Sequence, residues 1–165
     1  MSSHKRWVES RVVASNDWTS DVLPLTQDLW ENYTVRSTGC EAVVHLLADY
    51  IGPVAVMSFN PHAIAAVAKQ APHLCRGLVT DAFLPTEWPT VPEQRLKELA
   101  EIPDANALDV DFVSHDVATL HSNAVSRLKA DGLPIFCWTV KSTEQERLAR
   151  QIADQITFEG FVPAV

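Results

Sequence analysis

The sequence predicts an α/β fold built on a parallel β-sheet. From Val54 onward, short apolar segments rich in β-branched residues alternate with segments whose apolar residues recur at helical spacing. The connections between these segments are short, which favours strand–helix–strand units with right-handed crossovers. The segment LPIFCWTV (133–140) is almost continuously apolar, as is typical of a parallel strand buried on both faces.

Five strands are expected in this region, and helix signals lie between them. The predicted strands are 54–59, 77–80, 109–116, 133–140 and 155–159.

Capping residues mark the ends of the intervening helices. Asn60 followed by Pro61 is typical of a helix start, and a second helix is expected over 92–102. Gly132 ends a helix expected over 118–132, and Ser142 with Gln145 forms an S-x-x-Q capping box that opens the last helix.

Residues 1–53 are less regular. The segment VLPLTQDLW (22–30) is a possible further strand, and 39–52 reads as a helix. Its apolar residues expected to face inward are Val43, Val44, Leu46 and Leu47. Residues 1–21 show no period, so we expect one domain over 1–165 with an irregular N-terminal segment and the barrel-like part over 22–165.

Composition and charge exclude several function classes. The 165 residues are 47% hydrophobic and carry a formal net charge of −8, which argues against nucleic acid or an anionic membrane as the main partner. There is no apolar signal core at the start and no run of membrane-spanning length, so a soluble cytoplasmic protein is expected. Cys40, Cys75 and Cys137 show neither zinc nor disulfide spacing, and Cys137 is expected in the core.

Polar and aromatic residues gather where the predicted strands end, which is where α/β sheets bind ligands. They are Ser58-Phe59-Asn60, Thr80-Asp81, His115-Asp116, Trp138-Thr139 and Thr157-Phe158-Glu159. Polar strand ends also occur simply because loops meet water, so no single position is decisive.

Two features of this set suggest chemistry. His115 and Asp116 resemble a base and its carboxylate partner, but adjacent strand residues point to opposite faces, and Asp116 is equally suited to capping the next helix. Asp81, Asp116 and Glu159 offer oxygen ligands for a hard cation, without a recognised spacing.

Two long stretches resemble the glycerophosphodiester phosphodiesterase family. They are GPVAVMSFNPHAIAAVAKQAPHLCRGLVT and DGLPIFCWTVKSTEQERLARQIADQITFEGF, with DFVSHD fitting the strand between them. The match is collinear over roughly 52–161.

The resemblance implies a (β/α)₈ TIM barrel that hydrolyses glycerophosphodiesters to an alcohol and glycerol phosphate with a divalent cation, Mg²⁺ or Ca²⁺. Carried over by position, the substrate-binding residues would be Ser58, Phe59, Trp138, Thr139 and Glu159, although many relatives have Thr-Asp in place of Glu159.

The chain departs from the family in its expected catalytic residues. It has no His-Arg-Gly segment and no early Glu-Xaa-Asp, and Leu25, Thr26 and Gln27 stand near the expected place of a Glu-Xaa-Lys strand. The catalytic residues and metal ligands are therefore not identified, and His115 and Asp81 are only weak catalytic candidates.

The expected fold is a partial barrel of about five parallel βα units without the N-terminal strands, because a full barrel typically needs about 250 residues. Such a protein is expected to be weakly active or inactive alone. The alternative is a non-catalytic barrel remnant that associates with another chain through its exposed sheet, as a homo-oligomer or with a separate N-terminal half.

Overall fold

The computed structural model describes residues 37–164. The predictions for residues 1–36, including the possible strand at 22–30 and the positions of Leu25, Thr26 and Gln27, lie outside the described residues.

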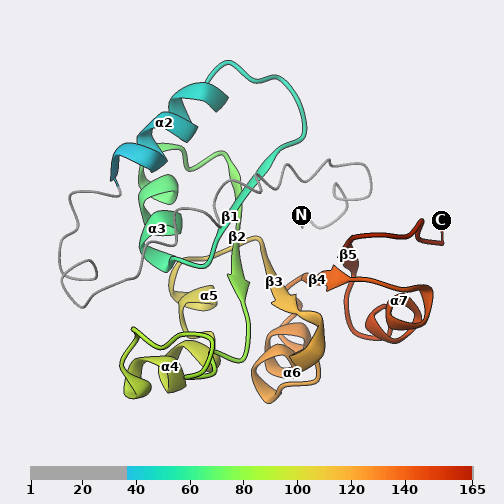
Figure 1. The fold of residues 1–165 in the computed structure, drawn as a ribbon. Helices are drawn as coiled ribbons and strands as arrows, with labels where there is room; N and C mark the ends of the chain where they lie inside the picture. The colour runs from blue at the N-terminus through green and yellow to red at the C-terminus, as the bar shows by residue number, and fades with distance from the viewer. Residues whose placement is uncertain (1–36, 165) are drawn as a thin grey trace.

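A five-stranded, fully parallel sheet forms the centre of the described region, in the order β1-β2-β3-β4-β5. The strands are β1 (Ala55–Ser58), β2 (Cys75–Thr80), β3 (Phe112–Asp116), β4 (Ile135–Val140) and β5 (Gln155–Phe158). The sheet curls into a half-barrel (Figure 1). All five predicted strands are confirmed, and with them the prediction of a partial barrel.

The helices follow one another around the outside of the curled sheet (Figure 1). They are α2 (Ser37–Leu47), α3 (Pro61–Gln70), α4 (Glu93–Ala100), α5 (Asp104–Ala107), η3 (Val117–Thr119), α6 (Asn123–Ala130) and α7 (Thr143–Ala149). Among these described helices, none is both long and apolar enough to serve as a membrane span.

The predicted caps account for two of the helix starts. The side chain of Asn60 accepts a hydrogen bond from the His62 N–H at 3.0 Å, and Pro61 fills the first position of α3. Ser142 accepts from the Gln145 N–H at 3.2 Å. Gln145 in turn accepts from the N–H of Lys141, one residue before the cap, at 2.7 Å.

The predicted helix over 118–132 is shorter than expected. Its first part is the 3₁₀ turn η3, and α6 begins only after Ser122, whose hydroxyl accepts from the Val125 N–H at 3.3 Å. Asp116 holds the N-cap position of η3, as the sequence suggested, but its side chain makes no capping hydrogen bond to the backbone. Gly132 follows α6 with φ +87°, as expected for a residue that ends a helix.

The largest core cluster lies between the sheet and its outer helices. Leu78, Val113 and Ile135 from neighbouring strands pack there with residues of α3 and α6. Cys137 is also buried in this cluster, as predicted. Leu46 on α2 is 78% exposed, so its predicted inward orientation is wrong.

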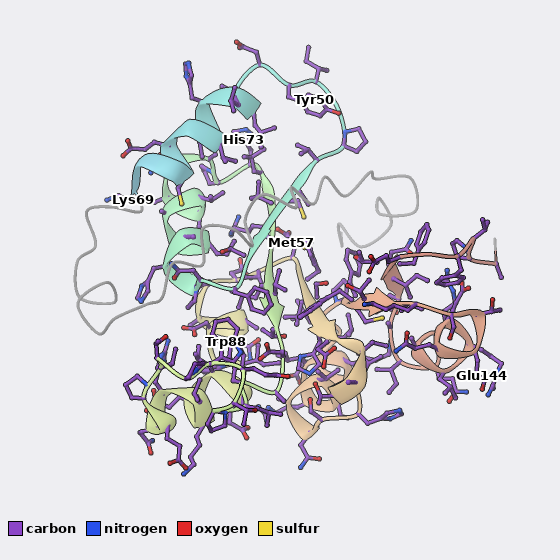
Figure 2. All side chains as sticks on the ribbon, viewed as in Figure 1. Tyr50, Met57, Lys69, His73, Trp88 and Glu144 are labelled. Carbon is purple, nitrogen blue, oxygen red and sulfur yellow. The ribbon has the colours of Figure 1, made fainter. Side chains whose placement is uncertain are left out.

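The opposite, concave face of the sheet carries a row of closely packed residues. Met57, Gly77 and Phe112 lie side by side across β1, β2 and β3, and Phe112 stacks on Phe136 with ring centroids 4.6 Å apart. Figure 2 shows Met57 on β1, at the centre of the molecule. A Cβ built at Gly77 would lie 2.4 Å from the Phe112 ring, so glycine is required for this close packing.

Candidate functional site

Strand alternation places four predicted residues on the concave face at the carboxyl ends of the strands. Phe59 follows Met57 by two residues, and Asp81, Asp116 and Trp138 hold equivalent places at the ends of β2, β3 and β4. Asp116 and Trp138 are register partners in neighbouring strands. In a parallel sheet these ends share one edge, so the four side chains line one common mouth.

Aromatic rings gather at this mouth, and we call Phe59, Phe83, Trp88 and Trp138 the mouth cluster. The centroid of Phe59 lies 5.4 Å from that of Trp138, with nearly perpendicular planes, and 5.5 Å from that of Trp88. Phe83 completes the cluster at 5.4 Å from Trp88. Because Phe59 follows β1 and Trp138 lies on β4, their contact is possible only across a curled sheet.

Asp81 holds the loop that carries Trp88. One carboxylate oxygen accepts from the Phe83 N–H at 2.6 Å, and the other accepts from the Trp88 indole N–H at 3.0 Å. Burial raises the pKa of Asp81, the two hydrogen bonds oppose this, and the negative charge of Asp116 raises it further. Figure 2 shows Trp88 on the loop between β2 and α4. The carboxylate therefore fixes one wall of the mouth.

His115 lies on the other face of the sheet. It is 1% exposed, its Nδ1 lies 2.8 Å from the Thr80 hydroxyl, and its Nε2 lies 3.1 Å from the Thr119 hydroxyl. Burial lowers the pKa of His115, although Asp116 opposes this. The ring therefore links β2, β3 and η3, and it meets Asp116 only through the Thr119 hydroxyl, which also donates to Asp116 Oδ2 at 3.4 Å.

The remaining predicted substrate-binding residues are not gathered at the mouth. Ser58 alternates with Met57 and so faces the helices, where its hydroxyl accepts from the Asn60 N–H at 3.0 Å. Glu159 is exposed and forms an ion pair with Lys141 at 3.6 Å. Thr139 is partly exposed and lies where the pairing of β4 with β5 changes register.

The described residues do not fit the divalent cation that the resemblance implies. No group of three or more His, Cys, Asp or Glu side chains within residues 37–164 is arranged to hold a metal ion. Asp81, Asp116 and Glu159 thus do not form the hard-cation site considered from the sequence. Both oxygens of Asp81 already accept N–H hydrogen bonds, which leaves them poorly suited to a metal.

Two members of the mouth cluster escaped sequence reasoning. Phe83 and Trp88 lie in the linker DAFLPTEWPTVP, which has neither helical nor strand periodicity. One signal could have indicated Trp88: Asp81 ends a strand, and the loop that follows carries a tryptophan. A buried carboxylate needs hydrogen-bond donors, and the indole N–H of a tryptophan is such a donor.

No family model and no curated protein matches the sequence. Solved structures match over about three quarters of this chain. A phosphodiesterase from Oleispira antarctica, solved with the product sn-glycerol-3-phosphate, is 20% identical with a TM-score of 0.57, over 75% of this chain and 46% of its own. A putative glycerophosphoryl diester phosphodiesterase from Silicibacter pomeroyi is 18% identical with a TM-score of 0.60, over 79% of this chain and 43% of its own.

A third match, the glycerophosphodiester phosphodiesterase of Thermotoga maritima, is 14% identical with a TM-score of 0.52, over 74% of this chain and 50% of its own. The chain therefore spans about half the length of the solved structures it matches. At these identities the likeness establishes the fold. The described residues have the fold of part of the barrel found in glycerophosphodiester phosphodiesterases.

Proposed function

We propose that this chain is a glycerophosphodiester phosphodiesterase-family polypeptide that carries part of the substrate site. The family reaction is metal-dependent hydrolysis of a glycerophosphodiester to an alcohol and glycerol phosphate. The observation that carries the proposal is the coincidence of collinear sequence motifs over 52–161 with the matching half-barrel fold. We further propose lipid metabolism in the cytoplasm as the setting of this activity.

The described residues support a binding and orienting role. Phe59, Trp88 and Trp138 present aromatic surface at the strand ends, which is suited to pack on a substrate and exclude water from it. Asp81 acts as a positioning residue through its hydrogen bond to Trp88. The metal of the family reaction would need ligands beyond those that residues 37–164 bring together.

Little or no hydrolysis is expected from this chain alone. Acid/base catalysis typically contributes about 100- to 10,000-fold, and within residues 37–164 the buried histidine at a strand end, His115, faces away from the mouth. Activity would require the complementary strands of the barrel to contribute the acid, the base and the metal ligands.

A chimera tests the proposal. Residues 52–164 would be joined to the N-terminal barrel strands of the Silicibacter pomeroyi structure, and choline release from glycerophosphocholine would be measured with Mg²⁺ or Ca²⁺. We expect hydrolysis that a chelator abolishes, and background rates from the unmodified chain. A chimera that is folded by circular dichroism but hydrolyses none of several glycerophosphodiesters would contradict the family assignment. Full turnover by the unmodified monomer would instead contradict the expectation that this chain alone has little or no activity.

The second candidate function is a non-catalytic barrel remnant that associates through its sheet. Within the described residues, β1 and β5 each pair with one neighbour only, and Phe158 on β5 is 47% exposed. The partner would be a second copy or a separate N-terminal half. Sedimentation of the purified chain, together with the chimera assay, distinguishes the two candidates. A stable homo-oligomer of the chain and the absence of hydrolysis by the chimera would favour the remnant.

A further inference from the structure

Four polar side chains form a continuous series of hydrogen-bond contacts from the outer face of the sheet to the mouth. The Thr80 hydroxyl lies 2.8 Å from Nδ1 of His115, whose Nε2 lies 3.1 Å from the Thr119 hydroxyl. That hydroxyl also donates to Oδ2 of Asp116 at 3.4 Å. We call these four side chains the relay. Thr80 and His115 are 4% and 1% exposed, so this end of the relay is closed to water.

A count of hydrogens fixes the direction of the hydrogen bonds in the relay. Its three contacts can be filled by three hydrogens, one from each threonine hydroxyl and one from the neutral imidazole ring. With the ring hydrogen on Nε2, the Thr80 hydroxyl donates to Nδ1 and the ring donates to the Thr119 hydroxyl. The Thr119 hydrogen is then available for Asp116, and every contact holds one hydrogen.

The opposite placement of the ring hydrogen leaves two groups unsatisfied. With the hydrogen on Nδ1, the ring donates to Thr80, and the Thr119 hydroxyl has to donate to Nε2. The Asp116 carboxylate then faces an oxygen lone pair. The buried Thr80 hydroxyl makes no other hydrogen bond within residues 37–164, so its own hydrogen has no acceptor there, which is costly.

The backbone beside the ring favours the same placement. A hydrogen bond with the Thr119 backbone raises the pKa of His115, as expected for a ring N–H that donates to a carbonyl. Because a carbonyl oxygen can only accept, the hydrogen belongs on the nitrogen that faces Thr119, which is Nε2.

We propose that Thr119 is a positioning residue for Asp116, and that the Nε2–H form of His115 sets the direction of the Thr119 hydroxyl. Oδ2 of Asp116 is then held by the relay. Oδ1 makes no hydrogen bond within residues 37–164 and is left to accept one from a ligand at the mouth. The part of this inference that concerns a substrate rests on the proposed function, whereas the relay itself depends on described residues alone.

Nitrogen-15 NMR of the full chain tests the direction of the relay without a catalytic readout. Protonated and unprotonated imidazole nitrogens resonate in separate regions of the spectrum, and loss of signals in His115→Gln assigns those of His115. Because burial lowers the pKa of His115, the ring is neutral at about pH 8. We expect Nε2 to be protonated and Nδ1 to be unprotonated.

Two substitutions of Asp116 separate hydrogen bonding from charge. Asp116→Asn removes the charge but keeps an oxygen that can accept from Thr119, so the Nε2–H form should persist. Asp116→Ala also removes the acceptor and frees the Thr119 hydroxyl to donate to Nε2. The ratio of Nε2–H to Nδ1–H should then fall roughly 2- to 13-fold. Asp131→Ala is the matched control, because Asp131 is an exposed acid at the end of α6.

Substitutions of Thr119 test whether its hydroxyl carries the coupling. In a Thr119→Val background, Asp116→Ala should no longer alter the His115 signals. Thr119→Ser keeps the hydroxyl and should preserve the effect of Asp116→Ala. A residue that only supports the packing of η3 would not produce this pattern.

Three results would overturn the inference. They are an Nδ1–H ring in the wild-type chain, equal changes in Asp116→Asn and Asp116→Ala, or an effect of Asp116→Ala that persists in the Thr119→Val background. Circular dichroism checks the folding of each variant. The wild-type spectrum needs no variant of the relay other than the one used for assignment, so it decides the direction even if the Asp116 variants do not fold.

The chimera described above connects the relay to activity. In an active chimera, Thr119→Val should lower kcat/KM roughly 2- to 13-fold, and Thr119→Ser should stay close to the unsubstituted chimera. Equal activity of the Thr119→Val chimera would contradict the positioning role and leave the proposed function standing. An inactive chimera would contradict the proposed function and leave the relay, as detected by NMR in the full chain, standing.

Discussion

Replacing Gly77 by alanine should destabilise the protein by overpacking its concave face. The added Cβ would lie 2.4 Å from Cε2 of Phe112, whereas ordinary contacts begin at 3.4 Å, so the ring would have to retreat by about 1 Å. Phe112 is 1% exposed and stacks on Phe136, which leaves it little room. Overpacking of this kind costs about 1–3 kcal/mol, and the lower entropy of the unfolded alanine chain offsets about 0.4–1 kcal/mol.

The expected net loss is about 1–2 kcal/mol in the free energy of unfolding, measured by urea denaturation, or about 2–8 °C in melting temperature. A double-mutant cycle identifies the cause. In a Phe112→Leu background the cost of Gly77→Ala should fall below about 0.5 kcal/mol, because the obstructing ring is gone. Gly132→Ala is the control, since nothing lies within 4 Å of its added Cβ and its φ of +87° is the source of any cost. A Gly77→Ala protein as stable as wild type would refute the packing described for the concave face.

Three further predictions concern hydrogen bonds. Asp81→Asn places an NH₂ group against one of the two N–H groups that now donate to the carboxylate. The substitution should therefore lower the free energy of unfolding by about 1–3 kcal/mol and shift Trp88 toward a more solvent-exposed environment. Unchanged hydrogen exchange in residues 81–88 would contradict this. Because burial lowers the pKa of His115 below its unfolded value near 6.5, its contribution to stability is complete above about pH 6.5 and is lost as the pH falls toward the folded pKa. Urea midpoints at pH 7.5 and 5 should therefore differ less in His115→Gln than in wild type, and an equal difference would refute the buried neutral ring. Ser142→Ala removes the cap of α7 and should cost about 1 kcal/mol, whereas the neighbouring exposed Thr143→Ala should cost less.

Much of the fold was accessible from the sequence because its signals are local. The predicted strand 133–140 is nearly continuous in apolar residues, which is typical of a strand buried on both faces. Asn60-Pro61 indicates a helix start independently of the tertiary fold. The 3₁₀ turn before α6 and the short helix α5 were not predicted. Each is only three or four residues long, which is too short for a periodic pattern.

The candidate site was predicted less well. Which residues a side chain at a strand end contacts depends on how the sheet curls, and the sequence pattern does not specify this. Alternation correctly separated His115 from Asp116, but it could not show that Phe59 reaches Trp138 across two intervening strands. Trp88 comes from a loop, and its place follows from a hydrogen bond to Asp81 that no sequence spacing specifies.

The contact between Phe59 and Trp138 also bears on the order of folding. Contacts between residues far apart in sequence form late, because the closure of a long loop has to precede them. These two rings belong to the first and fourth strands, so they meet only after the units between them have assembled. Ring-current shifts of the Phe59 protons should therefore appear among the last native signals during refolding, and they would serve as a spectroscopic mark that the curvature of the sheet is established.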